Sequence, residues 1–455
     1  MAFVKNYKEL AKSAERKIVL DLIEAAIFSI QPENVFGNSF KLNGNQLKIL
    51  DKTIDLSVFR RIFLLGFGKG SAANCAIIER TLGDRLDGGW DIDAVDARFS
   101  KVEYTKGTHP LVSATNVEFT QKVIDKLSHL GEHDLVLIVT CGGGSALLES
   151  PTVPLKTLIA VNEALLESGA NIHDMNVVRK HLSRVKGGGL AKIIYPAKAV
   201  NLIFSDVPGN DLTVIASAPT IPDPTTQDEA WNIYTKFGID KKVPLKKEDF
   251  TQTTSADRSP RSEGRGSLIF AQNSLHPRLE SRGFFAQNKA FENIDNILFL
   301  SNSTALEAMQ NKANDLGVDV RIYSDHFEGE AKEAGAKLVS ECSRGILLVG
   351  GETTVRASGG GSGGRNQEVV LGVLGSLPEN TIVASFDSDG WDNSPFAGAI
   401  GDKLTVKRAR DLNLDVQSFL NRNDSLNFFK QTGDGIETGR LDANVADLIV
   451  VYRYD

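Results

Sequence analysis

Short apolar runs alternate with longer amphipathic runs along most of this chain. The short runs have the length of strands and lie at 62–66, 135–141, 199–205, 297–301, 318–323, 346–350, 381–386 and 447–452. Helical spacing of apolar residues between them predicts helices at 71–86, 115–130, 155–168, 226–237, 305–316, 328–342 and 366–374. Continuous apolar strands alternating with helices are typical of parallel sheets covered on both faces. The predicted fold class is therefore α/β and doubly wound.

Two segments depart from this rhythm. Residues 1–30 mix lysines with apolar residues at helical spacing, which predicts an amphipathic helix rather than the unbroken apolar centre of a signal peptide. Residues 254–288 are rich in serine and arginine and lack periodicity, which favours a disordered insertion over a basic ligand-binding arm. A chain of 455 residues is long for one domain. We expect one domain at 1–245, an insertion or linker at 246–290 and a second domain at 291–455.

Composition narrows the class of protein. Hydrophobic residues make up 41% of the chain and charged residues 24%, which is typical of a globular protein. The net charge of −7 argues against nucleic acid as the main partner, and the apolar runs are too short to span a membrane. The three scattered cysteines form neither a disulfide framework nor a zinc-binding spacing, which fits a reducing, cytoplasmic location.

The glycine-dense stretch at 350–368 lies between an apolar strand and a helix-forming run. Glycine has no Cβ, so the backbone around Gly363 and Gly364 can approach a ligand closely. Arg365 and Asn366 follow where the helix is expected to begin. A guanidinium beside a helix N-terminus favours a phosphate or carboxylate site over a flexible linker.

Two further glycine turns follow expected strands, GFGKGSAAN at 66–74 and TCGGGSALL at 140–148. The first lacks both the P-loop pattern and GxGxxG, but Gly68 and Lys69 are placed to meet an anion; a tight turn with an exposed lysine is the alternative. The second predicts an anion cradle or carboxylate clamp. A nucleophilic serine is disfavoured because GxSxG is absent. The residues of this second site are Gly142, Gly143, Gly144 and Ser145.

Charged residues supply the remaining candidates. The run at 176–191 places Arg179 and Lys186 before three glycines, which is either a solvated helix face or a site for an anionic substrate. Aspartates follow two expected strands. Carboxylates at strand ends that face phosphate-binding turns suit Mg²⁺ and a nucleoside triphosphate, although Asp-Gly and Asn-Asp are also common in turns. These aspartates are Asp206, Asp211, Asp387, Asp389 and Asp392.

Taken in order, the motifs resemble those of glycerate kinases of the glycerate 2-kinase type. They are GKGSA at 68–72, GTHPL at 107–111, CGGGSALL at 141–148, NVVRKHLSRVKGGGLA at 176–191, SDVPGNDL at 205–212, IASAPTIPDPTT at 215–226, GGETTV at 350–355, GGGSGGRNQE at 359–368 and DSDGWD at 387–392. The resemblance covers nearly the whole chain except 254–288. It implies ATP-dependent phosphorylation of D-glycerate, with 2-phosphoglycerate as the favoured product. It also implies a large N-terminal Rossmann-like domain, a smaller C-terminal α/β domain of the MOFRL type, and an active site in the cleft between them.

The resemblance also implies residue roles. Lys69 and Arg365 match the family's active-site lysine and arginine and would offset charge on the transferred phosphoryl group. Asp206 or Asp387 would hold Mg²⁺ or accept the hydroxyl proton, and the sequence does not rank the two. The glycerate carboxylate would rest on Ser145 and the neighbouring glycines, with Arg179. Glu352 and Asp389 complete the implied set, Glu352 as a substrate or nucleotide contact and Asp389 as a metal ligand.

The chain departs from the family pattern at two notable positions. Ala218 stands where the family has glycine, and Asn210 stands where it has aspartate. Two other functions therefore stay open, an NAD(P)H-dependent hydroxypyruvate reductase and a non-catalytic metabolite-binding protein. The oligomeric state is also open, and a homodimer is compatible with the sequence.

Overall fold

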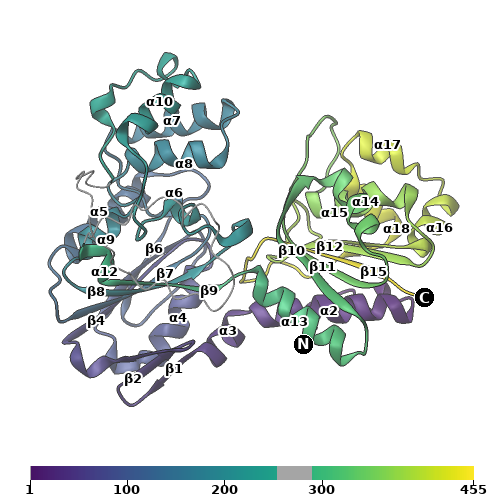
Figure 1. The fold of residues 1–455 in the computed structure, drawn as a ribbon, viewed down its shortest axis with the longest axis horizontal. Coiled ribbons are helices and arrows are strands. Elements are labelled where there is room, and N and C mark those ends of the chain that lie inside the picture. Colours follow the sequence, from purple (N-terminus) through teal and green to yellow (C-terminus); the bar gives the residue numbers. More distant parts are fainter. Residues whose placement is uncertain (1, 254–288) are drawn as a thin grey trace. The chain divides into compact units, whose positions relative to one another are not determined.

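The computed structural model describes residues 2–253 and 289–455, so the expected insertion at 254–288 lies outside the described residues (Figure 1). The chain forms two compact units. The N-terminal unit comprises Phe36–Ser205 and Asp211–Phe299, and the C-terminal unit comprises Leu300–Asp455 with Met1–Val35 and Asp206–Asn210. The α/β class predicted from the sequence is confirmed in both units.

The N-terminal unit is built on a six-stranded sheet in the order β6-β5-β4-β7-β8-β9. Its strands are β4 (Arg61–Phe67), β5 (Gly88–Asp93), β6 (Val102–Lys106), β7 (Asp134–Thr140), β8 (Lys198–Phe204) and β9 (Ile294–Leu300). Neighbouring strands from β6 to β8 run parallel. With β4 counted as the first strand, the order is 3-2-1-4-5-6, which is that of doubly wound nucleotide-binding sheets. The order reverses between β4 and β7, and ligands of such sheets bind at the carboxyl ends of the strands at this point.

Helices and a small second sheet complete the N-terminal unit. The helices are α4 (Ser71–Leu82), α5 (Ala114–Leu127), α6 (Gly144–Leu147), α7 (Leu155–Glu167), α8 (Ile172–His181), α9 (Gly189–Ile194), α10 (Gln227–Lys236) and α12 (Lys289–Glu292). The small antiparallel sheet contains β1 (Phe40–Asn43), β2 (Gln46–Ile49) and β3 (Lys52–Asp55), and α3 (Pro32–Ser39) precedes it. Helices α7, α8 and α10 enclose a separate apolar cluster around the buried side chains of Tyr234 and Phe250.

That cluster corrects one expected boundary. Residues 246–253 were assigned to the insertion, but Phe250 is 1% exposed and its ring lies 5.2 Å from that of Tyr234. Thr253 is also buried, and its hydroxyl donates to Asp223 at 2.9 Å. Residues 246–253 are therefore part of the folded N-terminal unit.

The C-terminal unit contains a mixed six-stranded sheet in the order β10-β11-β15-β12-β13-β14. Its strands are β10 (Val320–Glu330), β11 (Gly345–Thr354), β12 (Thr381–Asp387), β13 (Gly398–Gly401), β14 (Gly435–Ile436) and β15 (Asp447–Arg453). Strands β10 and β11 are parallel, but β15 is antiparallel to both β11 and β12. The expectation of parallel strands is wrong here. Burial on both faces produces a continuous apolar strand whatever its direction.

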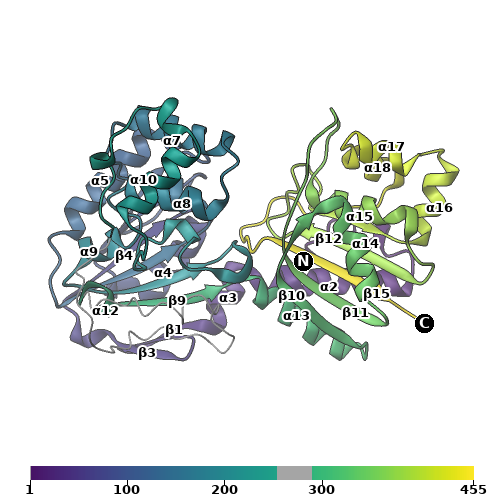
Figure 2. The same cartoon turned by 45° about the horizontal axis from the view of Figure 1, so that its top comes forward.

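Helices cover both faces of this sheet (Figures 1 and 2). One face packs against α2 (Ala14–Ile30) and α13 (Asn302–Asp315), and the other packs against α14 (Ala331–Glu341) and α15 (Arg365–Val373). The remaining helices of this unit are α1 (Tyr7–Leu10), α16 (Lys403–Asp411), α17 (Val416–Asn421) and α18 (Ser425–Thr432).

The N-terminal helix α2 belongs to the C-terminal unit, unlike the expected division at 1–245. Arg16 of α2 is fully buried, and its guanidinium lies 2.6 Å from the carboxylate of Asp402 and 2.7 Å from that of Asp434. A buried charge is costly unless it is paired, so these two aspartates fix the place of the helix. The sequence could not reveal partners that lie almost the whole chain away.

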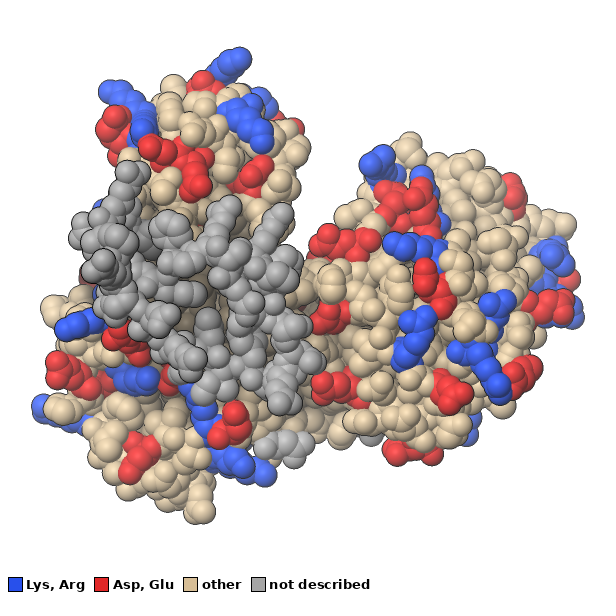
Figure 3. All heavy atoms as spheres, in the orientation of Figure 1, with Lys and Arg blue, Asp and Glu red and all other residues tan. Residues whose placement is uncertain are grey.

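Acidic and basic side chains of the described residues are interspersed over the face shown in Figure 3. None of the helices within the described ranges combines the length and hydropathy needed to cross a membrane.

Candidate active site

The residues expected to form a site divide between the two units. The N-terminal unit holds Gly68, Lys69, Gly142, Gly143, Gly144, Ser145, Arg179, Lys186 and Asp211. The C-terminal unit holds Asp206, Glu352, Gly363, Gly364, Arg365, Asn366, Asp387 and Asp389. Each group is described within its own unit.

In the N-terminal unit, the two glycine turns lie side by side where the strand order reverses. The N–H of Lys69 donates to the carbonyl of Gly142 at 2.8 Å, and the N–H of Cys141 donates to Phe67 at 3.0 Å. Gly68 has a φ of 112°, and a Cβ there would lie 2.5 Å from the carbonyl oxygen of Cys141. Only glycine allows this approach. The side chain of Lys69 stays exposed above the paired turns.

The first turn does not form the expected cradle of free N–H groups. The carboxylate of Asp93 accepts hydrogen bonds from the N–H groups of Gly70 at 2.9 Å and Ala72 at 3.2 Å, at the start of α4. The N–H of Gly68 donates to Ile92 at 3.2 Å. An internal carboxylate therefore occupies the position at which an anion was expected. What this turn offers to a ligand is the ammonium group of Lys69.

The second turn has the free donors that the first lacks. Within residues 2–253 and 289–455, the N–H groups of Gly142 and Gly143 have no hydrogen-bond acceptor. Gly143 has a φ of 75°, and both residues are partly exposed. Two adjacent N–H groups without partners, beside an exposed lysine, form a site that suits a carboxylate or phosphate.

Ser145 is held by a strained segment. Its hydroxyl lies 2.8 Å from the hydroxyl of Ser217, which donates to Asn176 at 2.9 Å. Ala216, Ser217 and Ala218 have φ values of 49°, 59° and 56°, which is the left-handed region that favours glycine. The glycine that the family has at the position of Ala218 would adopt this conformation without strain.

The basic run at 176–191 is not a solvated face. Lys186 and Glu149 are each 3% exposed and form a buried ion pair, and burial lowers the pKa of Lys186. Arg179 donates to Asn162 at 2.9 Å. Lys186 has its own counter-ion within the unit, so nothing in its contacts indicates a ligand.

Asp211 stabilises a turn. Its carboxylate accepts a hydrogen bond from the N–H of Thr213 at 2.9 Å and another from the hydroxyl of Thr213 at 2.7 Å. This is the turn chemistry kept as the alternative for this residue.

In the C-terminal unit, Arg365 lies among three carboxylates. Its guanidinium is 2.5 Å from Glu352 on β11, 2.7 Å from Asp447 on β15 and 3.4 Å from Asp387 on β12. Antiparallel pairing places Asp447 opposite Gly351 on one side and opposite Asp387 on the other. Glu352 directly follows Gly351, so the three carboxylates lie close together at the same end of these neighbouring strands. One positive charge faces three negative charges. The cluster therefore has an excess of negative charge.

Burial and the excess of negative charge shift the pKa values of Asp387, Asp447 and Arg365. Burial raises the pKa of Asp387 well above its usual value, and the nearby charge of Asp447 raises it further. Burial raises the pKa of Asp447 to about 7, although Arg365 opposes this change. For Arg365, burial lowers the pKa, but Asp447 and Glu352 outweigh it and the pKa is raised. Both aspartates are therefore harder to ionise than exposed carboxylates, and a further positive charge nearby would favour their ionised forms.

The N-terminus of α15 is also capped from within. The carboxylate of Asp392 accepts hydrogen bonds from the N–H groups of Asn366 at 3.0 Å and Gln367 at 2.9 Å. A Cβ at Gly364 would lie 2.1 Å from Asp392, and a Cβ at Gly363 would lie 2.0 Å from the hydroxyl of Ser425. These glycines permit close packing of the loop. Asp392 occupies these two N–H groups, so the guanidinium of Arg365 is the group at this helix terminus that is left to meet the expected anion.

The expected metal ligands Asp206, Asp387 and Asp389 are not assembled as a set. Asp389 shapes a turn, since its N–H donates to Asp387 at 3.1 Å and its carboxylate accepts from Trp391 at 2.8 Å. Asp206 follows β8 and is half-buried. Within the part of the chain that the structure describes, no group of three or more His, Cys, Asp or Glu side chains forms a ready metal site.

Three aspartates organise these sites, Asp93, Asp392 and Asp447. Sequence reasoning gave no role to Asp93 and Asp447, and it considered Asp392 only as a carboxylate for Mg²⁺. Each acts on a partner more than twenty residues away. Asp447 is the last residue of ANVAD at 443–447, which partly matches a motif of the family that the chain resembles and is the one signal that could have drawn attention to it.

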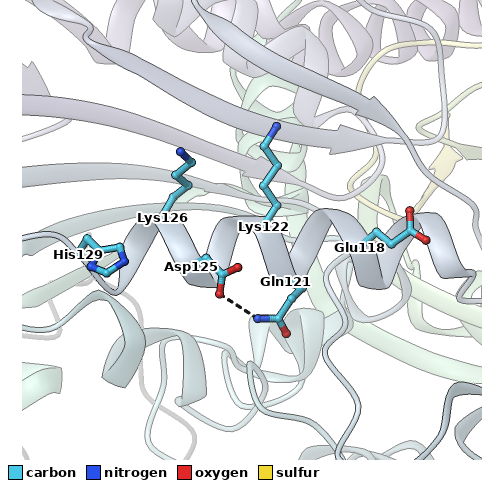
Figure 4. Close-up of a pocket in the computed structure, with 6 residues that line it drawn as sticks. All are labelled: Glu118, Gln121, Lys122, Asp125, Lys126 and His129. Carbon is cyan, nitrogen blue, oxygen red and sulfur yellow. Dashed lines mark hydrogen bonds between the residues drawn. The ribbon is translucent and has the colours of Figure 1, made fainter.

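A surface hollow along α5 offers no comparable chemistry (Figure 4). Its lining residues all come from the exposed side of one helix, at helical spacing. Gln121 donates to Asp125 at 3.1 Å within the helix. These side chains do not converge on a common point.

Two family models match successive parts of the chain. Residues 18–251 match the family described as a domain of unknown function, DUF4147, and residues 345–447 match the MOFRL family. A glycerate 2-kinase of Pyrococcus horikoshii is 32% identical over 96% of each chain. A relative from Agrobacterium vitis that is named after hydroxypyruvate reduction is 36% identical, covering 85% of this chain and 86% of that one.

Solved structures extend the likeness to the fold. The crystal structure of a glycerate kinase from Thermotoga maritima has a TM-score of 0.78 and 27% identity, covering 96% of this chain and 99% of that one. The protein is therefore an enzyme of the phosphotransferase class. The chain is a member of the glycerate kinase family in which a DUF4147 domain precedes a MOFRL domain.

Proposed function

We propose that this protein transfers the γ-phosphoryl group of ATP to D-glycerate and releases 2-phosphoglycerate. The observation that carries the proposal is the exposed ammonium group of Lys69 beside the free N–H groups of Gly142 and Gly143. Family membership supports the same reaction, since relatives that align with nearly the whole chain are named glycerate kinases.

The N-terminal unit is proposed to bind glycerate. A carboxylate accepts hydrogen bonds from two adjacent N–H groups without displacing any partner, and the hydroxyl of Ser145 lies in the same turn. Lys69 is then close enough to offset negative charge on the oxygens of the transferred group.

The C-terminal unit is proposed to meet the phosphates through Arg365. The carboxylates of Glu352, Asp387 and Asp447 outnumber the guanidinium, and carboxylate oxygens are the ligands that Mg²⁺ prefers. Asp387 is the proposed main ligand of a divalent cation, and Asp206 is a second candidate. When bound with ATP, Mg²⁺ would offset charge on the phosphate oxygens. Asp447 keeps Arg365 in place, and in-line transfer depends mainly on such positioning.

Hydroxypyruvate reduction is the second candidate function. Two observations favour it, the strand order of a nucleotide-binding sheet and the relative named after that reaction. The turn after β4 opposes it, because Asp93 occupies the N-terminus of α4, where dinucleotide-binding folds place a pyrophosphate.

Release of ADP tests the proposal. We expect ADP formation in the presence of ATP and Mg²⁺ to require D-glycerate and to saturate with it. Background hydrolysis without glycerate is the control. ADP release that does not depend on glycerate would contradict the proposal.

A further inference from the structure

His109 lies in the loop after β6, next to the glycine turn and Lys69. A Cβ on Gly143 would lie 2.8 Å from Cδ2 of His109, 2.9 Å from its Nε2 and 3.4 Å from Cγ of Lys69. The imidazole of His109 and the aliphatic part of the Lys69 side chain therefore both pack beside the Cα of Gly143. His109 and Lys69 are both exposed, so a ligand on this turn would contact both side chains.

A buried asparagine fixes the loop that carries His109. Asn116 is fully buried, and its amide oxygen accepts the N–H of Thr108 at 2.9 Å. Its amide nitrogen donates to the carbonyls of Thr108 at 2.9 Å and Ala146 at 2.8 Å. Ala146 directly follows Ser145, so Asn116 ties the histidine loop to the proposed glycerate site. The position of the imidazole is thus set before any ligand binds.

The charge around His109 favours the neutral ring. Burial lowers its pKa below the ordinary 6.5, and the positive charge of Lys69 lowers it further. Within the described residues, Lys69 is the charged group that acts on this pKa. At neutral pH the imidazole can therefore accept a proton, while Lys69 beside it carries the positive charge.

We propose that His109 is a catalytic residue, which accepts the proton of the glycerate hydroxyl as that hydroxyl attacks the γ-phosphorus of ATP. This inference rests on the proposed function. The hydroxyl O–H bond breaks and its proton moves to the unprotonated ring nitrogen. A new O–P bond forms, and the bond between the γ-phosphorus and the bridging oxygen breaks, with its electron pair leaving on ADP. Asp387 is thereby left to phosphate and cation binding rather than proton transfer.

The test compares His109→Asn and His109→Gln with His129→Asn, a control at an exposed position in the turn after α5. We expect both His109 variants to lower kcat by roughly 100-fold or more, the scale of losing a general base. Melting temperature and the dissociation constant for D-glycerate, measured by calorimetry, should stay close to wild type. The control should keep wild-type kcat.

The pH profile separates proton transfer from a structural role. In the wild type, kcat/KM for glycerate should fall as the pH drops through a value below 6.5, because the imidazole becomes protonated. The His109 variants should lack this acid limb. An active wild type whose variants keep both kcat and the acid limb would overturn the inference alone. A wild type that forms no phosphoglycerate would overturn the proposed function, and this inference with it.

Discussion

Asp447 holds Arg365 and the start of α15 together. One carboxylate oxygen lies 2.7 Å from Nε of Arg365, and the other accepts a hydrogen bond from the amide of Asn366 at 2.7 Å. Asp447 is 1% exposed and is the first residue of β15. The geometry of the arginine thus depends on a carboxylate that is costly to ionise in this position.

This relationship predicts a trade-off between activity and stability in Asp447→Asn. Arg365 loses the charged partner that orients it, so kcat should fall by roughly 10- to 100-fold. The pKa of Asp447 in the folded protein, about 7, is above the usual 3.8, so its contribution to stability is lost as the pH rises toward 7. The variant should therefore melt no lower than wild type at pH 8. Asp442→Asn, in the exposed loop before β15, is the matched control. Wild-type kcat in Asp447→Asn would disprove the orienting role.

Lys69→Ala should separate catalysis from folding. The side chain is exposed and the backbone contacts of the turn do not involve it, so the melting temperature should stay unchanged. Loss of a preorganised charge should lower kcat by roughly 100-fold or more. Steady-state kinetics with D-glycerate and Mg-ATP measure this, with Lys122→Ala on α5 as the control. A variant with wild-type kcat would remove Lys69 from the active site.

Arg365→Ala should differ from Lys69→Ala in one respect. Its removal leaves Glu352, Asp387 and Asp447 without the guanidinium, so both kcat and melting temperature should fall at pH 8. Combining the two substitutions should lower kcat little beyond the worse single variant, since groups that act together are not additive. Fully additive losses in kcat would show that the two residues act in separate steps.

Asp91 predicts a pH dependence of stability. It is fully buried on β5, and burial raises its pKa to about 7 from the usual 3.8, although hydrogen bonding from Ser71 opposes this rise. The neutral form is favoured in the folded state, so the stability this group supplies at low pH is lost as the pH rises from 3.8 toward 7. Asp91→Asn should remove this loss. Its free energy of unfolding relative to wild type should rise between pH 5 and pH 8, by up to a few kcal/mol.

Urea denaturation at the two pH values measures the effect of Asp91→Asn. Asp96→Asn, an exposed aspartate after the same strand, is the control and should show no such change. An equal effect of Asp91→Asn at pH 5 and pH 8 would contradict the assignment of a raised pKa.

Ala218→Gly should relieve backbone strain. Ala218 is buried with a φ of 56°, a conformation that costs a non-glycine residue about 1–2 kcal/mol. Greater freedom of glycine in the unfolded chain offsets roughly 0.4–1 kcal/mol of the gain. Thermal unfolding should show equal or higher stability, with kcat preserved. Ala199→Gly, in the buried strand β8, should instead lower stability. A clear loss of stability in Ala218→Gly would mean that its methyl group is needed for packing.

The sequence predicts strands and helices well where burial is complete. Strands β4, β7, β8 and β12 are continuous apolar runs and lie where expected. Strand β5 was missed because its sequence, GGWDID, contains two aspartates, which are rarely buried. Both aspartates are buried in the folded unit, and their burial cannot be seen in the sequence of the strand itself. The predicted direction of β15 was wrong, because a run of apolar residues indicates burial but does not indicate whether the strand is parallel or antiparallel.

The site was harder to predict than the fold. Glycine turns and strand ends were identified, but their N–H groups were expected to be free. Asp93 and Asp392 occupy two helix termini, and each comes from a segment more than twenty residues away in sequence. Lys69 and Gly143 were found from their motifs. The imidazole of His109 beside Gly143 was given no role, because only the folded loop brings it to the turn.

Phosphorus NMR of the reaction with D-glycerate, ATP and Mg²⁺ tests the central claim most directly. We predict equal amounts of ADP and 2-phosphoglycerate, with the phosphorus coupled to the single proton on C2 of the product. A phosphorus signal coupled to the two protons on C3 would contradict the proposed product. Absence of any phosphoglycerate, together with NADH or NADPH oxidation by hydroxypyruvate without ATP, would contradict the kinase assignment itself.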